Sequence, residues 1–467
     1  ASGTGIQEVA VAVHHLGGGI SHAIGTGGRD LHREIGGIMM KDAIAALEAD
    51  PATDVIVVVS KPPDPSVASE LRQMLRGLCK PSVVLFLGEK ERKSTGKVCY
   101  VSSTEQAAKQ AVALAGISWS LDGEERVFCK KFSETPKVLG LYAGGTLAGE
   151  TAHMMREALE LPEEEKAEGY VLKTGACEIL DLGDDLYTRG KPHPMMDPQA
   201  RDEKMAEMVR AIRRPVLVLT DVILGYGAAG RPAEGLAKAI RELVAEKKQS
   251  REQAAFFVHV LGTRQDVQGL EEQVRMLKEA GACVFTGNTE MVRAALKTAG
   301  YPEPAPSVLP EEPAESAGRP EPAGEGFGRL LQGPPGVINI GIKGFAEDLE
   351  RQRAKVIHFD WRPAAGGDRK LKAALHYLDH YKFCEGLYET INDANEAVLQ
   401  RIRESRPRLV DVLPAREVSH VLRQGKVLLH AGPPMKWEDM SHPMQGSCVG
   451  AVLFEEWVQT EEEAGEM

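Results

Sequence analysis

The chain has 467 residues, of which 43% are hydrophobic, 27% charged and 5% aromatic, and its formal net charge at pH 7 is -12. Such a length allows roughly three domains, each large enough to bury its own core. An acidic, aromatic-poor chain lacks the basic and stacking surfaces that nucleic acids require, and no apolar run reaches the ~18 residues that span a bilayer. We therefore expect neither nucleic acid nor a membrane as a partner.

The seven cysteines are scattered singly along the chain, without a C-x-x-C pair or the spacing of metal ligands. Their odd number and positions suit a reducing compartment, so we expect a cytoplasmic protein. Each cysteine is interpreted as a packing residue rather than a nucleophile, because no recognisable activating histidine stands beside one. The sequence requires no metal and no cofactor.

The chain opens with Ala-Ser-Gly-Thr-Gly-Ile-Gln-Glu, and residues 142–150 repeat its Gly, Thr and Glu at the same spacing. At 142–150 an apolar strand passes through two glycines into a helix. Glycines let the backbone approach an anion, and the amides of the first helical turn point at it. This pattern predicts phosphate-binding turns, although each turn could instead be a simple strand-to-helix connection that the threonine caps. The predicted phosphate-binding residues are Ser2, Gly3, Thr4, Gly144, Gly145 and Thr146.

Further sequence features recur in the same order in the two halves of this repeat. Residues 55–59 and 216–219 are matching apolar runs, and Thr104 and Thr289 each open the last helix of their half. Recurrence in order predicts an internal duplication of a domain of about 130 to 160 residues.

The predicted fold is α/β, with tandem flavodoxin-like, parallel-sheet domains at 1–120 and 136–300. In the second copy, residues 137–142 form the strand that leads into the glycine turn. The first copy has no such strand, so we expect a longer native protein with an apolar strand ahead of Ala1.

A lysine follows the first strand of copy one. Val55–Val59 is a continuous apolar run, typical of a parallel strand buried on both faces, and Ser-Lys-Pro-Pro comes directly after it. Open α/β sheets bind ligands at the carboxyl ends of their strands. Lys61 is therefore a candidate anion contact, with a solvated loop lysine as the alternative.

The loop at residues 181–198 of copy two gathers charged side chains among several prolines. Asp184 and Asp185 could orient a cationic group, and His193 could transfer a proton near neutral pH. Arg189 and Lys191 could hold a carboxylate or a phosphate. The alternative is a rigid surface loop with solvated charges.

Another glycine-and-hydroxyl turn stands ahead of a helix further along copy two. It contains Arg264, which is a further candidate anion contact.

The last third of the chain differs from the two copies in composition and in its expected elements. Residues 301–335 are rich in Pro, Glu and Ala and predict a linker. Residues 336–383 read as strand, helix, strand, glycine-rich turn and helix. Residues 388–467 predict an incomplete third α/β region, with apolar strands near 409–413 and 427–429.

Several separated motifs together resemble the FdrA family, which is related to the subunits of succinyl-CoA synthetase. They are SGTGIQE, GTGGRDL, VVVSKPP, GGTLAGE, DLGDDLYT, GKPHPMMDP, VINIGIKGFAEDL and HFDWRPAAGGD. The motifs NDANEAVLQRI, LVDVLPAREV, LLHAGPPMKWEDM and PMQGSCVGAVLFEEW resemble the start of the YlbE family. The chain is thus similar to an FdrA protein joined to the beginning of a YlbE protein.

The resemblance implies a subunit of oxamate carbamoyltransferase, an enzyme that converts oxalurate and phosphate to oxamate and carbamoyl phosphate in anaerobic allantoin breakdown. It implies YlbE-like and third-subunit partners, a functional link to carbamate kinase, and a homo- or hetero-oligomer.

The chain also departs from the synthetase pattern. The histidine loop that carries phosphate in the synthetases is replaced near residues 89–97 by a charged stretch without histidine. The CoA-binding half of those relatives is expected ahead of Ala1. Two alternatives therefore stay open: an acyl-CoA ligase that uses CoA, and a non-catalytic scaffold.

Overall fold

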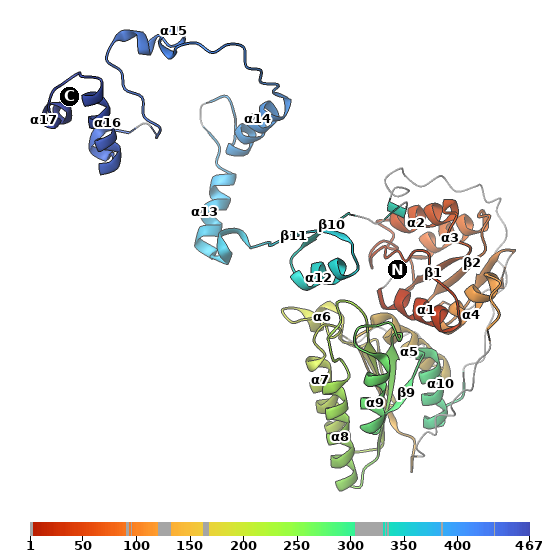
Figure 1. Cartoon of the computed structure of the whole chain (residues 1–467). Helices are drawn as coiled ribbons and strands as arrows, with labels where there is room; N and C mark the ends of the chain where they lie inside the picture. Colours follow the sequence, from red (N-terminus) through yellow and green to blue (C-terminus); the bar gives the residue numbers. More distant parts are fainter. Residues whose placement is uncertain are drawn as a thin grey trace. The chain divides into compact units, whose positions relative to one another are not determined.

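The computed structural model describes residues 3–89, 93–94, 96–119, 132–161, 168–303, 330–331, 333, 336–383, 386–433 and 435–467. The chain divides into two compact units, Ala1–Trp361 and Arg362–Met467, which are described separately. The first unit contains two larger sheets with helices on both faces (Figure 1). The described part of the chain contains no helix long and apolar enough to cross a bilayer.

The first copy is a three-stranded parallel sheet in the order β1-β2-β3. Helices α1 and α4 cover one face and α2 and α3 the other, and β2 is buried along its whole length. The apolar strand expected at residues 55–59 is confirmed as β1, and helix α2 precedes it. The elements are α1 (Gly3–His15), α2 (Ile38–Ala49), β1 (Ile56–Ser60), α3 (Pro65–Arg76), β2 (Ser82–Phe86), β3 (Val98–Tyr100) and α4 (Thr104–Leu114).

The second copy is a six-stranded sheet in the order β5-β6-β4-β7-β8-β9, parallel except for β5. Helices α5 and α10 cover one face, and α7, α8 and α9 cover the other. Its elements are β4 (Lys137–Tyr142), α5 (Gly145–Ala158), β5 (Leu172–Lys173), β6 (Cys177–Asp181), α6 (Asp185–Thr188), α7 (Gln199–Ala211), β7 (Val216–Ile223), α8 (Glu234–Gln249), β8 (Ala254–Leu261), α9 (Leu270–Glu279), β9 (Cys283–Phe285) and α10 (Asn288–Ala299).

The predicted parallel-sheet α/β fold is confirmed. Helices α1 and α5 begin at Gly3 and Gly145, the two positions that the sequence repeat aligns. Strands β1, β2 and β3 of the first copy follow one another as β7, β8 and β9 do in the second. The first copy has no described strand in the place that β4 takes beside β7.

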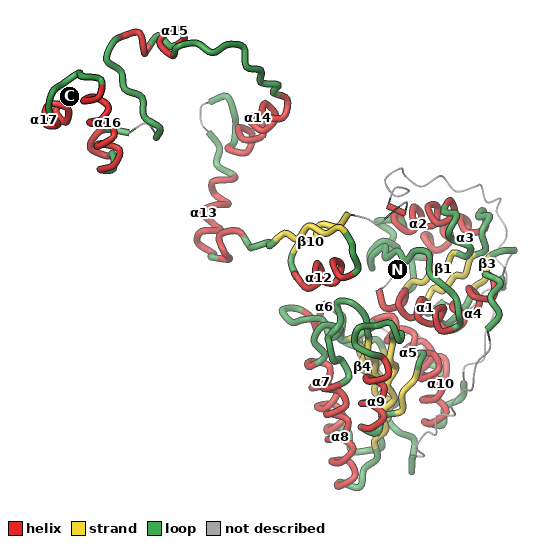
Figure 2. The backbone as a smooth tube through the Cα atoms, viewed as in Figure 1, coloured by secondary structure: helices red, strands yellow, loops and turns green. Residues whose placement is uncertain are grey.

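The two copies meet through four helices, with α1 and α4 packing against α5 and α10 (Figure 2). Glu150 of α5 lies at the start of α4 and is fully buried. Its carboxylate accepts hydrogen bonds from the Thr104 amide (2.8 Å) and hydroxyl (2.9 Å), the Asn288 side-chain amide (2.7 Å) and the Thr289 hydroxyl (3.2 Å). A helix N-terminus stabilises a carboxylate, so this one joins both copies.

Glu8 of α1 takes the corresponding position at the start of α10. One carboxylate oxygen accepts the Asn288 backbone amide at 3.0 Å, and the other lies 2.6 Å from Nε2 of His259 in β8. His259 is fully buried, and its Nδ1 lies 3.3 Å from the Phe285 carbonyl oxygen. The first helix of each copy therefore places a glutamate at the N-terminus of the other copy's last helix.

Residues 336–361 form a separate βαβ element, as the sequence predicts. Its parallel strands β10 (Gly336–Ile340) and β11 (Lys355–Phe359) are joined by α12 (Lys343–Arg351). The linker expected at 301–335 lies almost entirely outside the described residues.

The second unit is helical where it is regular. It contains α13 (Arg369–Asp379), α14 (Ile391–Glu404), α15 (Ala415–Val418), α16 (His442–Phe454) and α17 (Glu461–Glu466). The strands expected near 409–413 and 427–429 are wrong, since both runs lack strand structure and Leu409 and Val410 are exposed. Apolar residues alone do not make a strand, because its backbone groups need a paired neighbour.

Removing the Glu150 carboxylate should destabilise the first unit strongly. Glu150→Ala leaves buried donors on Thr104, Asn288 and Thr289 without an acceptor, so we expect a loss of about 3 kcal/mol or more in unfolding free energy. Glu150→Gln keeps an acceptor oxygen and should cost roughly 1 kcal/mol. The exposed Glu242→Ala, measured by the same denaturant titration, should stay within about 0.5 kcal/mol of wild type. Equal effects of Glu150→Ala and Glu242→Ala would contradict the proposed role of this carboxylate.

The His259–Glu8 pair should make stability depend on pH. Burial lowers the pKa of His259, but the charge and hydrogen bond of Glu8 outweigh it, so the folded pKa lies above 6.5. The stabilisation of the folded state by this pair is then complete below about pH 6.5, and it is lost as the pH rises through the folded pKa of His259. Between pH 6 and pH 9, the unfolding free energy of the wild type should fall as the pH rises, and that of His259→Gln should change less. The exposed His442→Gln should follow the wild-type curve.

Candidate functional site

The glycine turn before α5 is held by a buried carboxylate. Asp221 of β7 accepts hydrogen bonds from the amides of Ala143 (2.8 Å) and Gly144 (2.7 Å), and it is fully buried. Burial raises the pKa of Asp221, and nearby Arg201 and the two amide hydrogen bonds oppose that rise. The prediction that the Gly144 amide binds phosphate therefore needs correcting, because this donor already has an acceptor.

The starts of α1 and α5 touch at their threonines. The Thr146 amide lies 3.4 Å from the Thr4 hydroxyl oxygen, and both side chains are buried. A Cβ on Gly144 would come within 3.0 Å of the Thr4 methyl group. Two positive helix ends thus converge at one point, which favours an anion nearby. Binding of phosphate by this pair of turns stays a prediction, and Ser2 lies outside the described residues.

A second carboxylate flanks the same turn from the opposite side. Asp181 ends β6, and its Oδ1 accepts the Gly183 amide at 3.0 Å. Its Oδ2 lies 3.7 Å from Lys61 Nζ, and a Cβ built on Gly145 would meet it at 2.2 Å. Burial raises the pKa of Asp181, and the charge of Lys61 opposes the rise. Asp181 is therefore a candidate proton carrier.

The two aspartates mark the ligand-binding edge of the sheet. Strand β4 lies between β6, which carries Asp181, and β7, which carries Asp221. The chain leaves β4 toward one side and later crosses to the other, so the carboxyl end of β4 is the switch point where open α/β sheets bind ligands.

A cavity of about 650 Å³ opens beside this turn. One wall comes from copy one and includes Lys61 and Gly88. Another is a face of α5 with Gly145, Gly149 and Arg156, and the far wall contains the segment 168–171 and Tyr187. The volume suits a small molecule, and both copies contribute to the cavity.

Cationic groups stand at two places along the cavity. Lys61 lies beside the start of α5, and Arg156 lies about three turns further along that helix. The Arg156 Nε is buried without a hydrogen-bond acceptor among the described residues, and one Nη reaches the Val171 carbonyl only at 3.5 Å. A guanidinium with unused donors suits a planar carboxylate. The cavity therefore offers two separate positions for anionic groups.

The structure brings together only some of the residues predicted from sequence. Lys61, Gly145 and Asp184 line the cavity, and Asp184 also caps α6 by accepting the Leu186 amide at 3.0 Å. Thr4 and Thr146, whose contact is described above, do not line it. The other predicted side chains outside the lining are those of Asp185, Arg189, Lys191, His193 and Arg264.

Each of these has another environment. His193 accepts the Met195 amide at 3.2 Å and packs on Gly183, whereas Arg264 is exposed and lies 3.0 Å from Glu271. Asp185, Arg189 and Lys191 are exposed. Catalytic or substrate-binding roles for these residues stay predictions.

Sequence reasoning missed Asp181, Asp221 and Arg156. Both aspartates follow apolar strand residues, a signal that could have been read as ligand-facing strand ends. Arg156 gave no such signal, because it is one of several charged residues at the end of an amphipathic helix.

Two family models match the chain in this region. The CoA-ligase model covers residues 141–298, and the CoA binding domain model covers residues 1–88. The second copy is therefore similar to a CoA-ligase domain, and the first copy to a CoA binding domain. The match at 1–88 corrects the expectation that the CoA-binding half lies ahead of Ala1.

Curated relatives come from Escherichia coli (strain K12). The uncharacterized protein YahF is 37% identical over 305 residues, which are 62% of this chain and 59% of YahF. The oxamate carbamoyltransferase subunit AllG is 49% identical over 78 residues, 17% of this chain and 19% of AllG. The uncharacterized protein YahG is 36% identical over 138 residues, 30% of this chain and 28% of YahG.

These matches support an FdrA-like relationship to succinyl-CoA synthetases, and the chain spans 59% of YahF and less of the other two relatives. A solved structure, PH0766 from Pyrococcus horikoshii OT3, is 12% identical over 56% of each chain. Its TM-score of 0.23 is too low to indicate a shared fold.

Any side chain at residue 145 should collide with Asp181. Gly145→Ala should lower the unfolding free energy by about 1–3 kcal/mol, and in an Asp181→Ser background the same change should cost at least roughly 1 kcal/mol less. Gly149→Ala is the matched control on the same helix face, where a Cβ meets nothing within 4 Å. It should be neutral or stabilising, because alanine favours a helix. Equal costs of Gly145→Ala in both backgrounds would show that Asp181 is not the obstacle.

Proposed function

We propose that the chain is a subunit of an oxamate carbamoyltransferase that converts oxalurate and phosphate to oxamate and carbamoyl phosphate. The observation that carries the proposal is the cavity between the copies, with cationic groups at two separated positions. Oxalurate has a carboxylate and phosphate is an anion, so this reaction needs two anion sites near one another. The 49% identity to part of AllG adds support from a named carbamoyltransferase subunit.

In this proposal, phosphate lies at the inner end of the cavity. Lys61 and the positive end of the α5 dipole stabilise its charge. Arg156 holds the oxalurate carboxylate, which leaves the carbamoyl group pointing toward the phosphate. Holding both reactants in one cavity removes much of the entropic cost of their encounter.

The reaction exchanges one bond for another. A phosphate oxygen attacks the terminal carbamoyl carbon of oxalurate, and the bond from that carbon to the oxamyl nitrogen breaks. The nitrogen takes up one proton and leaves as the amide of oxamate. Asp181, whose pKa is raised by burial, stands beside the start of α5 and passes this proton on, and it regains one from the hydrogen phosphate.

A second candidate function is acid–thiol ligation with CoA. It is favoured by the matches of residues 1–88 and 141–298 to CoA-binding and CoA-ligase models. The two functions differ in their requirements, since the ligase needs CoA and a nucleotide whereas the carbamoyl transfer needs only phosphate. Under either function, we propose that the chain works with YlbE-like and third-subunit chains.

The test is an assay of the assembled complex with oxalurate and phosphate, following carbamoyl phosphate formation with and without CoA and ATP. Carbamoyl phosphate should form without either cofactor. Formation of an acyl-CoA product, strictly dependent on CoA, would instead establish the ligase.

Two substitutions should affect different substrates in that assay. Lys61→Met should raise the KM for phosphate, and Arg156→Leu should raise the KM for oxalurate, each roughly ten- to a hundredfold for the loss of one charge-assisted interaction. Lys238→Met and Arg275→Leu, both on outer helices, are controls for loss of charge. If Arg189→Leu or Lys191→Met raised the oxalurate KM while Arg156→Leu did not, the substrate would bind at the 181–198 loop instead.

A further inference from the structure

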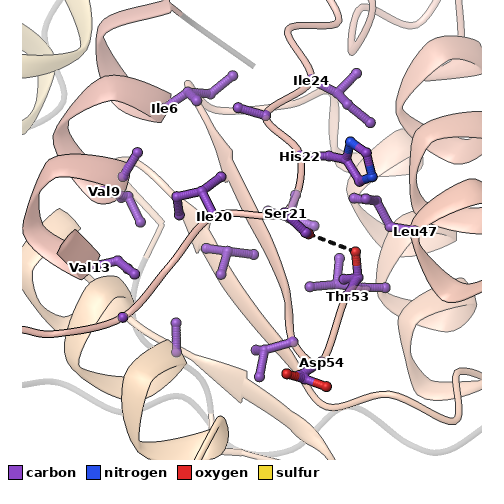
Figure 3. A pocket seen from close by; sticks show the side chains of 18 of the residues that line it. Ile6, Val9, Val13, Ile20, Ser21, His22, Ile24, Leu47, Thr53 and Asp54 are labelled. Atoms are coloured by element: carbon purple, nitrogen blue, oxygen red, sulfur yellow. Dashed lines mark hydrogen bonds between the residues drawn. The ribbon is translucent and has the colours of Figure 1, made fainter. Parts of the chain in front are cut away.

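Two histidines of the first unit are engaged by carboxylates. His22, in the wall of an apolar cavity beside β1, lies 3.4 Å from the Asp50 carboxylate (Figure 3). His259 is fully buried and lies 2.6 Å from Glu8. A carboxylate partner fixes an imidazole ring in place and uses one of its nitrogens. The second unit contains a pair of histidines with a different environment.

Helix α13 carries two histidines that face each other. His376 and His380 are four residues apart, so their side chains are neighbours on one face of the helix. Their Nδ1 atoms lie 2.7 Å apart, and their ring centroids are 4.0 Å apart. Both side chains are exposed, so a solute can reach the rings directly.

The contact between the two Nδ1 atoms depends on a shared proton. A neutral imidazole has one N–H and one nitrogen lone pair, so one Nδ1 donates and the other accepts. His380 Nδ1 also lies 2.8 Å from the His376 carbonyl oxygen, which suits it as the donor. If that proton moves to Nε2 of the same ring, both Nδ1 lone pairs become available to one metal ion.

The spacing of the two nitrogens suits particular metal ions. A bond from an imidazole nitrogen to such a metal is about 2.0–2.1 Å long. Two bonds of this length whose nitrogens lie 2.7 Å apart enclose an angle of about 80° at the metal, close to two adjacent positions of a tetragonal ion. A tetrahedral ion would need the nitrogens about 3.3 Å apart. The pair therefore fits Cu²⁺ or Ni²⁺ better than Zn²⁺.

The position of the pair on the helix also favours a cation. His376 lies in the last turn of α13 and His380 is its C-cap. The last carbonyl groups of a helix have no partners within it and carry the negative end of the helix dipole. A metal ion bound here is therefore stabilised by the helix as well as by its two ligands.

We propose that His376 and His380 form a bidentate site for a divalent transition-metal ion of the copper and nickel class, with both Nδ1 atoms as ligands. Within the part of the chain that the structure describes, no third His, Cys, Asp or Glu joins them, so water fills the remaining positions. Two protein ligands at an exposed surface give an exchangeable ion rather than a structural one. The proposal does not depend on the function proposed above.

The experiment titrates the full chain with Cu²⁺ and records its electron paramagnetic resonance spectrum. The first ion bound should show nitrogen couplings from two imidazoles. His376→Gln and His380→Gln should each remove one of these couplings and weaken Cu²⁺ binding roughly tenfold or more, because the second ligand otherwise binds within the same molecule. Ni²⁺ should bind more weakly than Cu²⁺, and Mg²⁺, which prefers oxygen ligands, should not compete.

A matched control keeps the number of histidines and changes their spacing. In the double variant His380→Gln, Leu378→His the two imidazoles are two residues apart and do not face each other, so Cu²⁺ binding should fall as in His380→Gln alone. His442→Gln removes another exposed histidine and should bind like wild type. Equal Cu²⁺ affinity in the wild type and the double variant would overturn the proposal, and so would a wild-type spectrum with a single imidazole.

Discussion

The first unit depends on two buried glutamates that cross between its copies. Glu150 reaches from α5 to the start of α4, and Glu8 reaches from α1 to the start of α10. Each carboxylate satisfies donors that a helix N-terminus would otherwise leave unpaired, and each requires the other copy to be in place. A buried carboxylate without its donors is very costly, so these contacts set how the four helices pack.

This packing creates the candidate site. Because α1 and α5 are held side by side, their N-termini converge at Thr4 and Thr146. Copy one then closes one side of a cavity whose other walls belong to copy two, and Lys61 comes within 3.7 Å of Asp181. Neither copy alone contains both a lysine and an aspartate at this point, so the chemistry of the cavity arises from the pairing.

The glycine turn before α5 contacts a buried carboxylate on one side and faces the cavity on the other. Its Ala143 and Gly144 amides hold the Asp221 carboxylate, which stabilises the turn from within, while Gly145 faces Asp181 and the cavity. The internal carboxylate uses the donors deepest in the turn and leaves the cavity side for a ligand. A repeated Gly-Thr motif therefore serves first as a packing device, and any anion binding is added at its outer edge.

The sequence by itself determined the parallel α/β architecture, the duplication landmarks and the importance of the glycine turns, because hydrophobic periodicity and glycine spacing are local signals. Lys61 and Gly145, which line the cavity, were singled out by these signals, and their roles stay predictions. Only the tertiary structure decided which charged residues share a cavity, since Arg156 and Asp181 of the second copy line the same cavity as Lys61 of the first. It also showed that the apolar runs near 409–413 and 427–429 are not strands, because strand formation depends on a partner that a local pattern does not reveal.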